Sequence, residues 1–184
     1  MPSLTNTILL ALAAFTPFTL AAPSFYTSTE PTSLAKRADY YPVTALGYAD
    51  YCGEAAENYK TNANSPLIAD CQQIPKDHPG YGYWLITVAE TNALGPNGWV
   101  RLAQSGTCAF EVAWEFSNNN NNGKVVDYKF GTNDLGFYVR AYAHENNPNY
   151  PGKVETGYAV ACGTTRVPGE HGPVVFLRWR MTRA

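Results

Sequence analysis

The stretch from Cys108 to Phe116 reads CAFEVAWEF and is the clearest strand pattern in the chain. Successive side chains of a strand point to opposite faces of the sheet. One face would therefore carry Cys108, Phe110, Val112, Trp114 and Phe116. The other face would carry two alanines and the carboxylates Glu111 and Glu115, which we expect to be surface charges. A sheet with one core face and one partly wet face is typically antiparallel.

Further runs along the chain favour strands in the same way. They are rich in β-branched and aromatic residues and are bounded by turn residues. Two of them flank a turn-rich segment, Asn92 to Gly98 (NALGPNG), so we expect a hairpin there. The runs are Tyr83 to Ala89, Trp99 to Ala103, Val125 to Phe130, Val154 to Cys162 and Val174 to Met181.

Two segments predict helices. In the first, Ser65 is placed to cap, Pro66 suits the first helical position and Pro75 ends the helix. In the second, the caps Thr132-Asn133-Asp134 precede a stripe of apolar residues at i, i+3, i+4 and i+7, formed by Leu135, Tyr138, Val139 and Tyr142. The order of elements predicts a small α+β sandwich with an antiparallel sheet and two helices. The tract Asn118 to Asn122 is expected to form an exposed loop.

Composition sets broad limits. The chain has 184 residues, 45% of them hydrophobic and 15% charged, with a formal net charge of −2. These values fit one folded domain and exclude a disordered polyelectrolyte. Basic residues are scattered, so no nucleic-acid partner is expected.

The amino-terminal part has the pattern of a secretory leader. Residues 8 to 20 (ILLALAAFTPFTL) are too short to span a bilayer, and they predict a signal peptide over 1–21. A buried helix is the alternative. A polar propeptide then runs over 22–37 and ends in the dibasic pair Lys36-Arg37, a site for a Kex-type protease unless the pair is an incidental loop feature. We expect the domain over 38–163 and a carboxyl-terminal extension with an added strand over 164–184.

The four cysteines, Cys52, Cys71, Cys108 and Cys162, predict two disulfides in a secreted protein. Their spacings of 19, 37 and 54 residues lack the close pairs of a zinc site, so no metal is expected. Three connectivities remain open. We prefer Cys52–Cys162 with Cys71–Cys108, because it ties the ends of the domain together.

Several motifs carry a family resemblance. In chain order they are Cys52-Gly53, SPLIADCQQI from Ser65, GTCAF from Gly106, FGTND from Phe130, and Gly157 to Cys162. Together they resemble the necrosis-inducing-factor domain of secreted fungal effectors, the extracellular-protein-two family, over about residues 50 to 163. The resemblance implies a cysteine-stabilised extracellular effector that promotes virulence or cell death, with a distant likeness to killer toxins. It transfers no catalytic residue and implies no cofactor.

The candidate chemical groups form no obvious catalytic set. An acid or base would come from His78, His144 or His171, with His144-Glu145 and Arg140 as a possible ribonuclease cluster and Glu54 or Glu57 as further carboxylates. Four tryptophans offer a sugar platform, although most are expected in the core: Trp84, Trp99, Trp114 and Trp179. The basic tail of Arg178, Arg180 and Arg183 is expected at a solvated strand edge, with contact to anionic lipid or glycan as the alternative.

Two functions from different classes follow. The favoured one is a monomeric, non-enzymatic effector that binds a host or competitor target, whether protein, glycan or membrane. The alternative is a small secreted hydrolase, such as a ribonuclease or a glycan-active enzyme. A cleft that joins a histidine, a carboxylate and an arginine would favour the enzyme.

Overall fold

The computed structural model describes residues 37–44, 49–96, 98–116, 125–163 and 174–184. The predicted signal peptide, most of the predicted propeptide with Lys36, the tract Asn118 to Asn122 and His171 lie outside the described residues. None of the described helices is long and apolar enough to cross a membrane.

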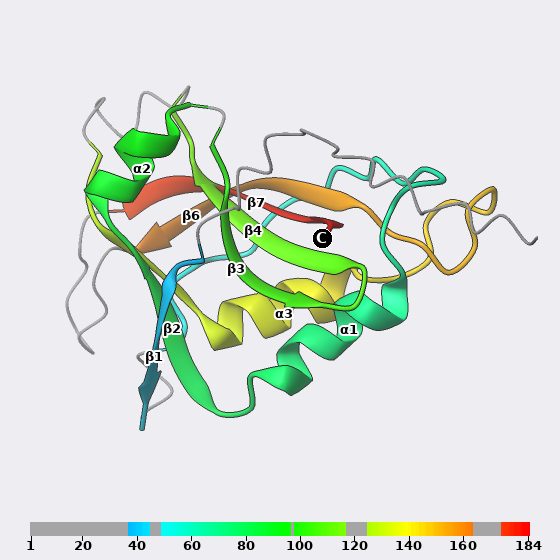
Figure 1. The fold of residues 1–184 in the computed structure, drawn as a ribbon, viewed down its shortest axis with the longest axis horizontal. Coiled ribbons are helices and arrows are strands. Elements are labelled where there is room, and N and C mark those ends of the chain that lie inside the picture. Colours follow the sequence, from blue (N-terminus) through cyan, green and yellow to red (C-terminus); the bar gives the residue numbers. More distant parts are fainter. Residues whose placement is uncertain (1–36, 45–48, 97, 117–124, 164–173) are drawn as a thin grey trace, which may run out of the picture. The chain divides into compact units, whose positions relative to one another are not determined.

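The described residues form seven strands and three helices (Figure 1). The strands make two antiparallel sheets, ordered β1-β2-β5 and β3-β4-β7-β6. The α+β class with antiparallel pairing is therefore confirmed, with a second sheet and a third helix in addition. The elements are β1 (Asp39–Val43), α1 (Ile68–Asp77), β2 (Tyr81–Ile86), α2 (Val88–Leu94), β3 (Val100–Ser105), β4 (Cys108–Trp114), β5 (Tyr128–Gly131), α3 (Thr132–Tyr142), β6 (Thr156–Gly163) and β7 (Val174–Arg183).

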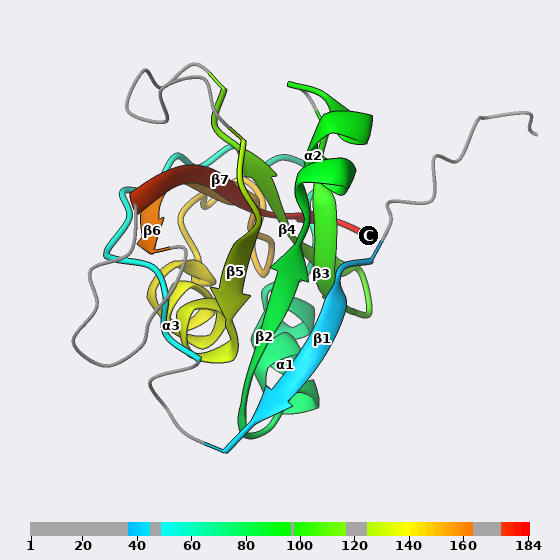
Figure 2. The ribbon, with the colours of Figure 1, turned by 90° about the vertical axis from the view of Figure 1, so that its left-hand side faces the viewer.

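Helices α1 and α3 lie side by side against the sheets (Figures 1 and 2). Helix α1 contacts β3 and β4, whereas α3 contacts β2 and β5. The Tyr138 ring of α3 stacks on Trp179 of β7 at 4.9 Å and also meets Phe130 of β5 at 5.9 Å. One helix thus joins the two sheets through a shared aromatic core. The face of the four-stranded sheet away from these helices is called the outer face below.

Strand β4 is buried on both faces, which corrects the expectation of a half-wet strand. All seven of its residues are buried, including Glu111, whose side chain is only 3% exposed. The strand is central, between β3 and β7, and arginines from both neighbours cover its outer face. Phe116, expected in the core, lies beyond the end of the strand and is 41% exposed.

The expected hairpin between residues 83 and 103 is wrong. Strand β2 belongs to the three-stranded sheet and β3 to the four-stranded sheet. Helix α2 separates them because Thr87 and Glu90 form a capping box. Glu90 N donates to Thr87 Oγ1, and Thr87 N donates to the Glu90 carboxylate at 2.9 Å. The Thr-x-x-Glu spacing was present in the sequence and outweighs the strand propensity of this run.

Helix boundaries also differ from expectation. Helix α1 begins at Ile68, and Pro75 lies inside its last turn rather than ending it. Ser65 does not cap the helix but stabilises the preceding loop, because its hydroxyl accepts a hydrogen bond from Asn62 N at 2.9 Å. Strand β5 is shorter than the expected run and begins at Tyr128. The stripe on α3 is confirmed, with Tyr142 only partly buried.

The strand expected at the carboxyl terminus is β7, and it lies in the centre of its sheet. It pairs with β4 from Cys108↔Arg183 and with β6 from Thr156↔Met181. Residues 174–184 are therefore an integral part of the domain. Without them β4 and β6 would lose their common partner.

The predicted processing site adjoins the start of the described fold. Ala38 is buried and its N–H donates to Arg101 O at 3.3 Å, a bond that the ammonium of a chain beginning at Ala38 can also make. We expect the secreted protein to begin at Ala38. Amino-terminal sequencing of secreted material checks this, and Ala22 as the sole start would contradict it. An Arg37→Ala control should suppress the cleavage.

Candidate functional site

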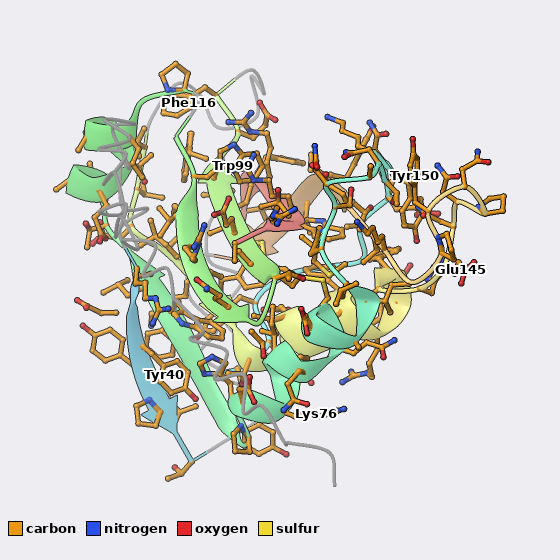
Figure 3. All side chains as sticks on the ribbon, turned by 45° about the vertical axis from the view of Figure 1, so that its right-hand side comes forward. Tyr40, Lys76, Trp99, Phe116, Glu145 and Tyr150 are labelled. Atoms are coloured by element: carbon orange, nitrogen blue, oxygen red, sulfur yellow. A yellow bond between two sulfur atoms is a disulfide. The ribbon has the colours of Figure 1, made fainter. Side chains whose placement is uncertain are left out.

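A groove of about 410 Å³ lies on the four-stranded sheet and is called the outer-face groove. Trp99 forms part of one wall (Figure 3). The groove brings together residues of β6 and β7 with residues outside the strands, namely Asn58, Lys60, Trp99, Glu115 and Glu155. Its lining consists of Asn58, Lys60, Trp99, Glu115, Glu155, Thr156, Gly157, Tyr158, Ala159, Arg178, Trp179 and Arg180.

The floor of the groove is formed by small residues of β6, which leave space between the two walls. Gly157 pairs with Arg180 and Ala159 pairs with Arg178 across the β6–β7 ladder. A Cβ on Gly157 would lie 2.3 Å from the Trp179 carbonyl oxygen and 2.8 Å from Arg180 Cβ. Because those distances are too short, β6 approaches β7 this closely only with glycine at that position.

The first wall consists of two guanidinium groups against one indole ring. Arg180 Cζ lies 4.1 Å and Arg178 Cζ 5.1 Å from the centroid of Trp99. Arg178 also donates from Nη2 to the Pro96 carbonyl at 2.7 Å, and its Nε lies 3.7 Å from a carboxylate oxygen of Glu115. Stacking on an aromatic ring restricts a guanidinium while leaving its in-plane N–H edge able to bind. All three arginines of the expected basic tail thus lie on β7, a central strand, and not on a strand edge.

A buried carboxylate holds this wall in place. Glu111 Oε1 accepts from Arg101 Nε and Nη2 at 3.2 and 3.0 Å, and Oε2 accepts from Arg180 Nε and Nη2 at 2.8 and 2.5 Å. Glu111 is therefore a structural anchor and not the expected surface charge. Two cations on one anion leave this cluster with a net positive charge. The ion pairs with Arg101 and Arg180 compensate the buried negative charge of Glu111, which would otherwise be costly to remove from water.

The opposite wall comes from a segment that runs beside β6. Isolated bridges join Cys52 to Cys162 and Tyr59 to Thr156, and Lys60 N donates to Glu155 O at 2.8 Å. The Lys60 side chain is exposed. On the same wall, the Glu155 carboxylate accepts hydrogen bonds from Ser65 Oγ and Asn62 Nδ2 at 3.0 and 3.2 Å.

The disulfides connect this site to the core. They are Cys52–Cys162 and Cys71–Cys108, the pairing preferred from the sequence. The first attaches the segment before Lys60 to β6. The second attaches α1 to β4. The first disulfide therefore holds the wall that contains Lys60 against β6, whereas the second fixes β4, the strand that carries Glu111.

The two histidines that the structure describes, His78 and His144, do not form the cluster that a hydrolase would need. His144 is exposed and its Nε2 lies 3.1 Å from the Tyr59 hydroxyl, and within the described residues it makes no hydrogen bond or ion pair with Arg140 or Glu145. His78 packs between Tyr40 and Trp84, and burial lowers its pKa. Within the described ranges, neither ring makes a hydrogen bond or ion pair with a carboxylate.

Other residues singled out from the sequence are dispersed. Trp84, Trp114 and Trp179 are buried, so Trp99 alone of the four tryptophans offers an accessible ring at the groove. Three carboxylates, Glu54, Glu57 and Glu145, are exposed on loops. Arg183 donates to the Asn64 carbonyl at 3.4 Å. No group of three or more His, Cys, Asp or Glu in the described part of the chain is arranged to hold a metal.

A buried carboxyl fastens the segment before the first disulfide to α3. The Asp134 carboxylate accepts from the backbone N–H groups of Tyr51, Cys52 and Gly131 at 2.8, 3.0 and 3.0 Å. Burial raises the pKa of Asp134 from its ordinary 3.8 to about 7. The hydrogen bonds from Tyr51 and Cys52 oppose this rise, whereas Asp50 adds to it.

This pKa predicts a pH dependence of stability. The folded carboxyl keeps its proton up to about pH 7, whereas the unfolded carboxyl releases it near pH 4. The contribution of Asp134 to stability is therefore greatest at low pH and falls as the pH rises towards 7. The lowered pKa of His78 acts in the opposite sense, so a matched variant is needed. We expect Asp50→Asn to flatten the decline, because an amide removes the neighbouring negative charge. Urea unfolding at pH 4.5, 6 and 7.5 measures the free energy of unfolding of the parent protein and of Asp50→Asn. If stability changed with pH in the same way in both proteins, this account would be contradicted.

Comparison with known proteins gives one assignment. None of the curated proteins compared matches the chain. A family model does match residues 51–162, and its description is pathogen effector and candidate necrosis-inducing factor. The matched part contains all four cysteines, the segment opposite β6, and Trp99. It ends before β7, so Arg178 and Arg180 lie outside it. Because the match covers more than half of the chain, this protein belongs to the Hce2 family of pathogen effectors.

Proposed function

We propose that this protein is secreted and promotes cell death by binding a target through the outer-face groove, without acid–base catalysis. The observation that carries the proposal is the fixed arrangement of Arg178 and Arg180 against Trp99, above the Glu111 anchor. Preorganised donors beside an aromatic ring are typical of recognition sites. The target is a molecule of a host or a competitor, and the protein acts as a monomer.

Secretion and processing belong to the same proposal. The signal peptide over 1–21 and the propeptide over 22–37 would deliver the domain to an oxidising compartment. Two disulfides form and persist in such a compartment.

A pair of matched lysine variants tests the groove. Lys60→Glu reverses one exposed charge at the groove, and Lys76→Glu reverses one on α1, which contacts the other face of the sheet (Figure 3). Infiltration of the purified proteins into leaf tissue measures the dose that causes cell death. We expect Lys60→Glu to raise that dose about tenfold, equivalent to about 1.4 kcal/mol of binding. Lys76→Glu should act like the parent protein. Equal doses for parent and Lys60→Glu would overturn the proposal.

The hydrolase alternative has its own test in the same assay. His144 is the exposed histidine of the described residues, and its replacement removes only the contact with the Tyr59 hydroxyl. His144→Ala should stay within a few-fold of the parent, because a general acid or base contributes roughly a hundredfold or more. If the variant folds by circular dichroism yet loses nearly all activity, the enzyme replaces the binding effector.

A further inference from the structure

We infer that the outer-face groove binds an acidic oligosaccharide, a short chain of sugar rings that carry carboxylates. This inference rests on the proposed function, since it names the chemical class of the target. It joins three features of the groove, namely its charge, the geometry of its polar groups and the way β6 is covered.

The charge around the groove favours an anion. Glu111 neutralises only one of the two guanidiniums that bind it, and Glu115 is already close to Arg178. The exposed ammonium of Lys60 faces the groove from the opposite wall. Around the groove four basic side chains, Lys60, Arg101, Arg178 and Arg180, thus stand against three acidic ones, Glu111, Glu115 and Glu155, although the whole chain has a net charge of −2. Local charge of this sign attracts anions, and charged N–H donors make strong hydrogen bonds to carboxylates.

The remaining lining suits sugar rings. Trp99 is partly exposed and lines the groove, so it offers an apolar ring face with a polar tip. Sugars present the matching combination, because their C–H faces are apolar and their rims carry hydroxyls. Asn58 and Glu155 add planar groups that can hydrogen-bond to hydroxyls. A volume of about 410 Å³ lies in the range of small-ligand sites, roughly 300 to 1,000 Å³.

An acidic peptide fits the same groove less well. Peptides often bind by adding a strand to an open sheet edge. Here the segment containing Cys52 and Tyr59 is bridged to β6 and occupies part of that edge. The floor between the walls consists of Gly157 and Ala159, which provide no deep pocket for a side chain. A ligand lying flat on this floor and reaching both charged walls matches the geometry better.

The experiment titrates the secreted protein with three probes and follows binding by calorimetry and by the indole signal of Trp99 in NMR spectra. The probes are trigalacturonic acid, an uncharged trisaccharide and hexaglutamate. We expect trigalacturonic acid to bind and to shift the Trp99 signal. We expect the uncharged sugar and the peptide to bind at least tenfold more weakly. Lys60→Glu should weaken binding of trigalacturonic acid at least fivefold, and Lys76→Glu should not change it.

Three outcomes overturn the inference. Equal binding of the uncharged trisaccharide would remove the role of charge, and tighter binding of hexaglutamate would assign the groove to acidic peptides. No binding of trigalacturonic acid would remove the oligosaccharide. If it fails while Lys60→Glu still loses cell-death activity, the proposed function stands and only the ligand class falls. If it binds in the groove and Lys60→Glu loses binding but keeps activity, the proposed function falls and the oligosaccharide site stands.

Discussion

Replacing Cys71 and Cys108 together with alanine should lower the free energy of unfolding by about 4 kcal/mol. The bridge closes a separation of 37 residues, and loop-closure entropy in the unfolded chain gives a value of that size. Both cysteines are fully buried between α1 and β4, so the change also leaves a small void. Since a domain of this size has roughly 5 to 15 kcal/mol of stability, the loss is a large fraction of the total.

Denaturant unfolding of the double variant and the parent measures this effect. The double variant avoids the free thiol that Cys108→Ala alone would leave on Cys71. We expect cell-death activity, where the parent shows it, to fall with the folded fraction. A matched comparison is Cys52→Ala with Cys162→Ala, whose separation of 110 residues predicts about 5 kcal/mol. A loss below about 1 kcal/mol for either pair would show that the bridges are dispensable.

Replacing Glu111 with glutamine should destabilise the fold by about 3 kcal/mol. Removing one partner of a buried ion pair typically costs about 3 to 5 kcal/mol, because the remaining charge is left uncompensated. The lower end applies here, because the side chains of Arg101 and Arg180 are 21% and 38% exposed and can turn partly towards water. The same change should loosen the stack of Arg180 on Trp99.

Glu115→Gln is the matched control for Glu111→Gln, because the control residue is a carboxylate on the same face of the same sheet. Its side chain is more exposed and lies 3.7 Å from Arg178 Nε, so we expect a change below about 1 kcal/mol. Thermal and urea unfolding measure both variants, and Trp99 fluorescence reports on the wall of the groove. Equal effects for the two variants would contradict the role of Glu111 as an anchor.

Local patterns in the sequence predicted those elements whose stability comes from neighbours along the chain. Helix α3 follows from its i, i+3, i+4 stripe, and β4 from its alternation. The expected caps Thr132, Asn133 and Asp134 form the first turn of α3 instead, and its N-cap is Gly131. The capping box of α2 was equally local, but the β-rich composition around Thr87 concealed it. The start of helix α1 is displaced by two residues, from Pro66 to Ile68, because Ser65 is used by a tertiary contact with Glu155 instead of a cap.

The groove was not predictable in the same way, because its members are far apart in sequence. Arg180 is 69 residues from Glu111, and its partner ring Trp99 precedes β3. Lys60 joins the groove only because its segment is bridged to β6. The hydrophobic periodicity of a single segment does not indicate which distant strand it will pair with or in which register.

The sequence by itself determined the family, the α+β class, the helix α3 and the even set of four cysteines, because each depends on residue types and short spacings. Only the tertiary structure decided that Glu111 is buried, that β7 is a central strand and that Trp99 is the tryptophan with an accessible ring at the groove. Those outcomes depend on which strands pair and in which register. Strand pairing is a long-range choice governed by the burial of whole faces, so it becomes visible only when the complete sheet is formed.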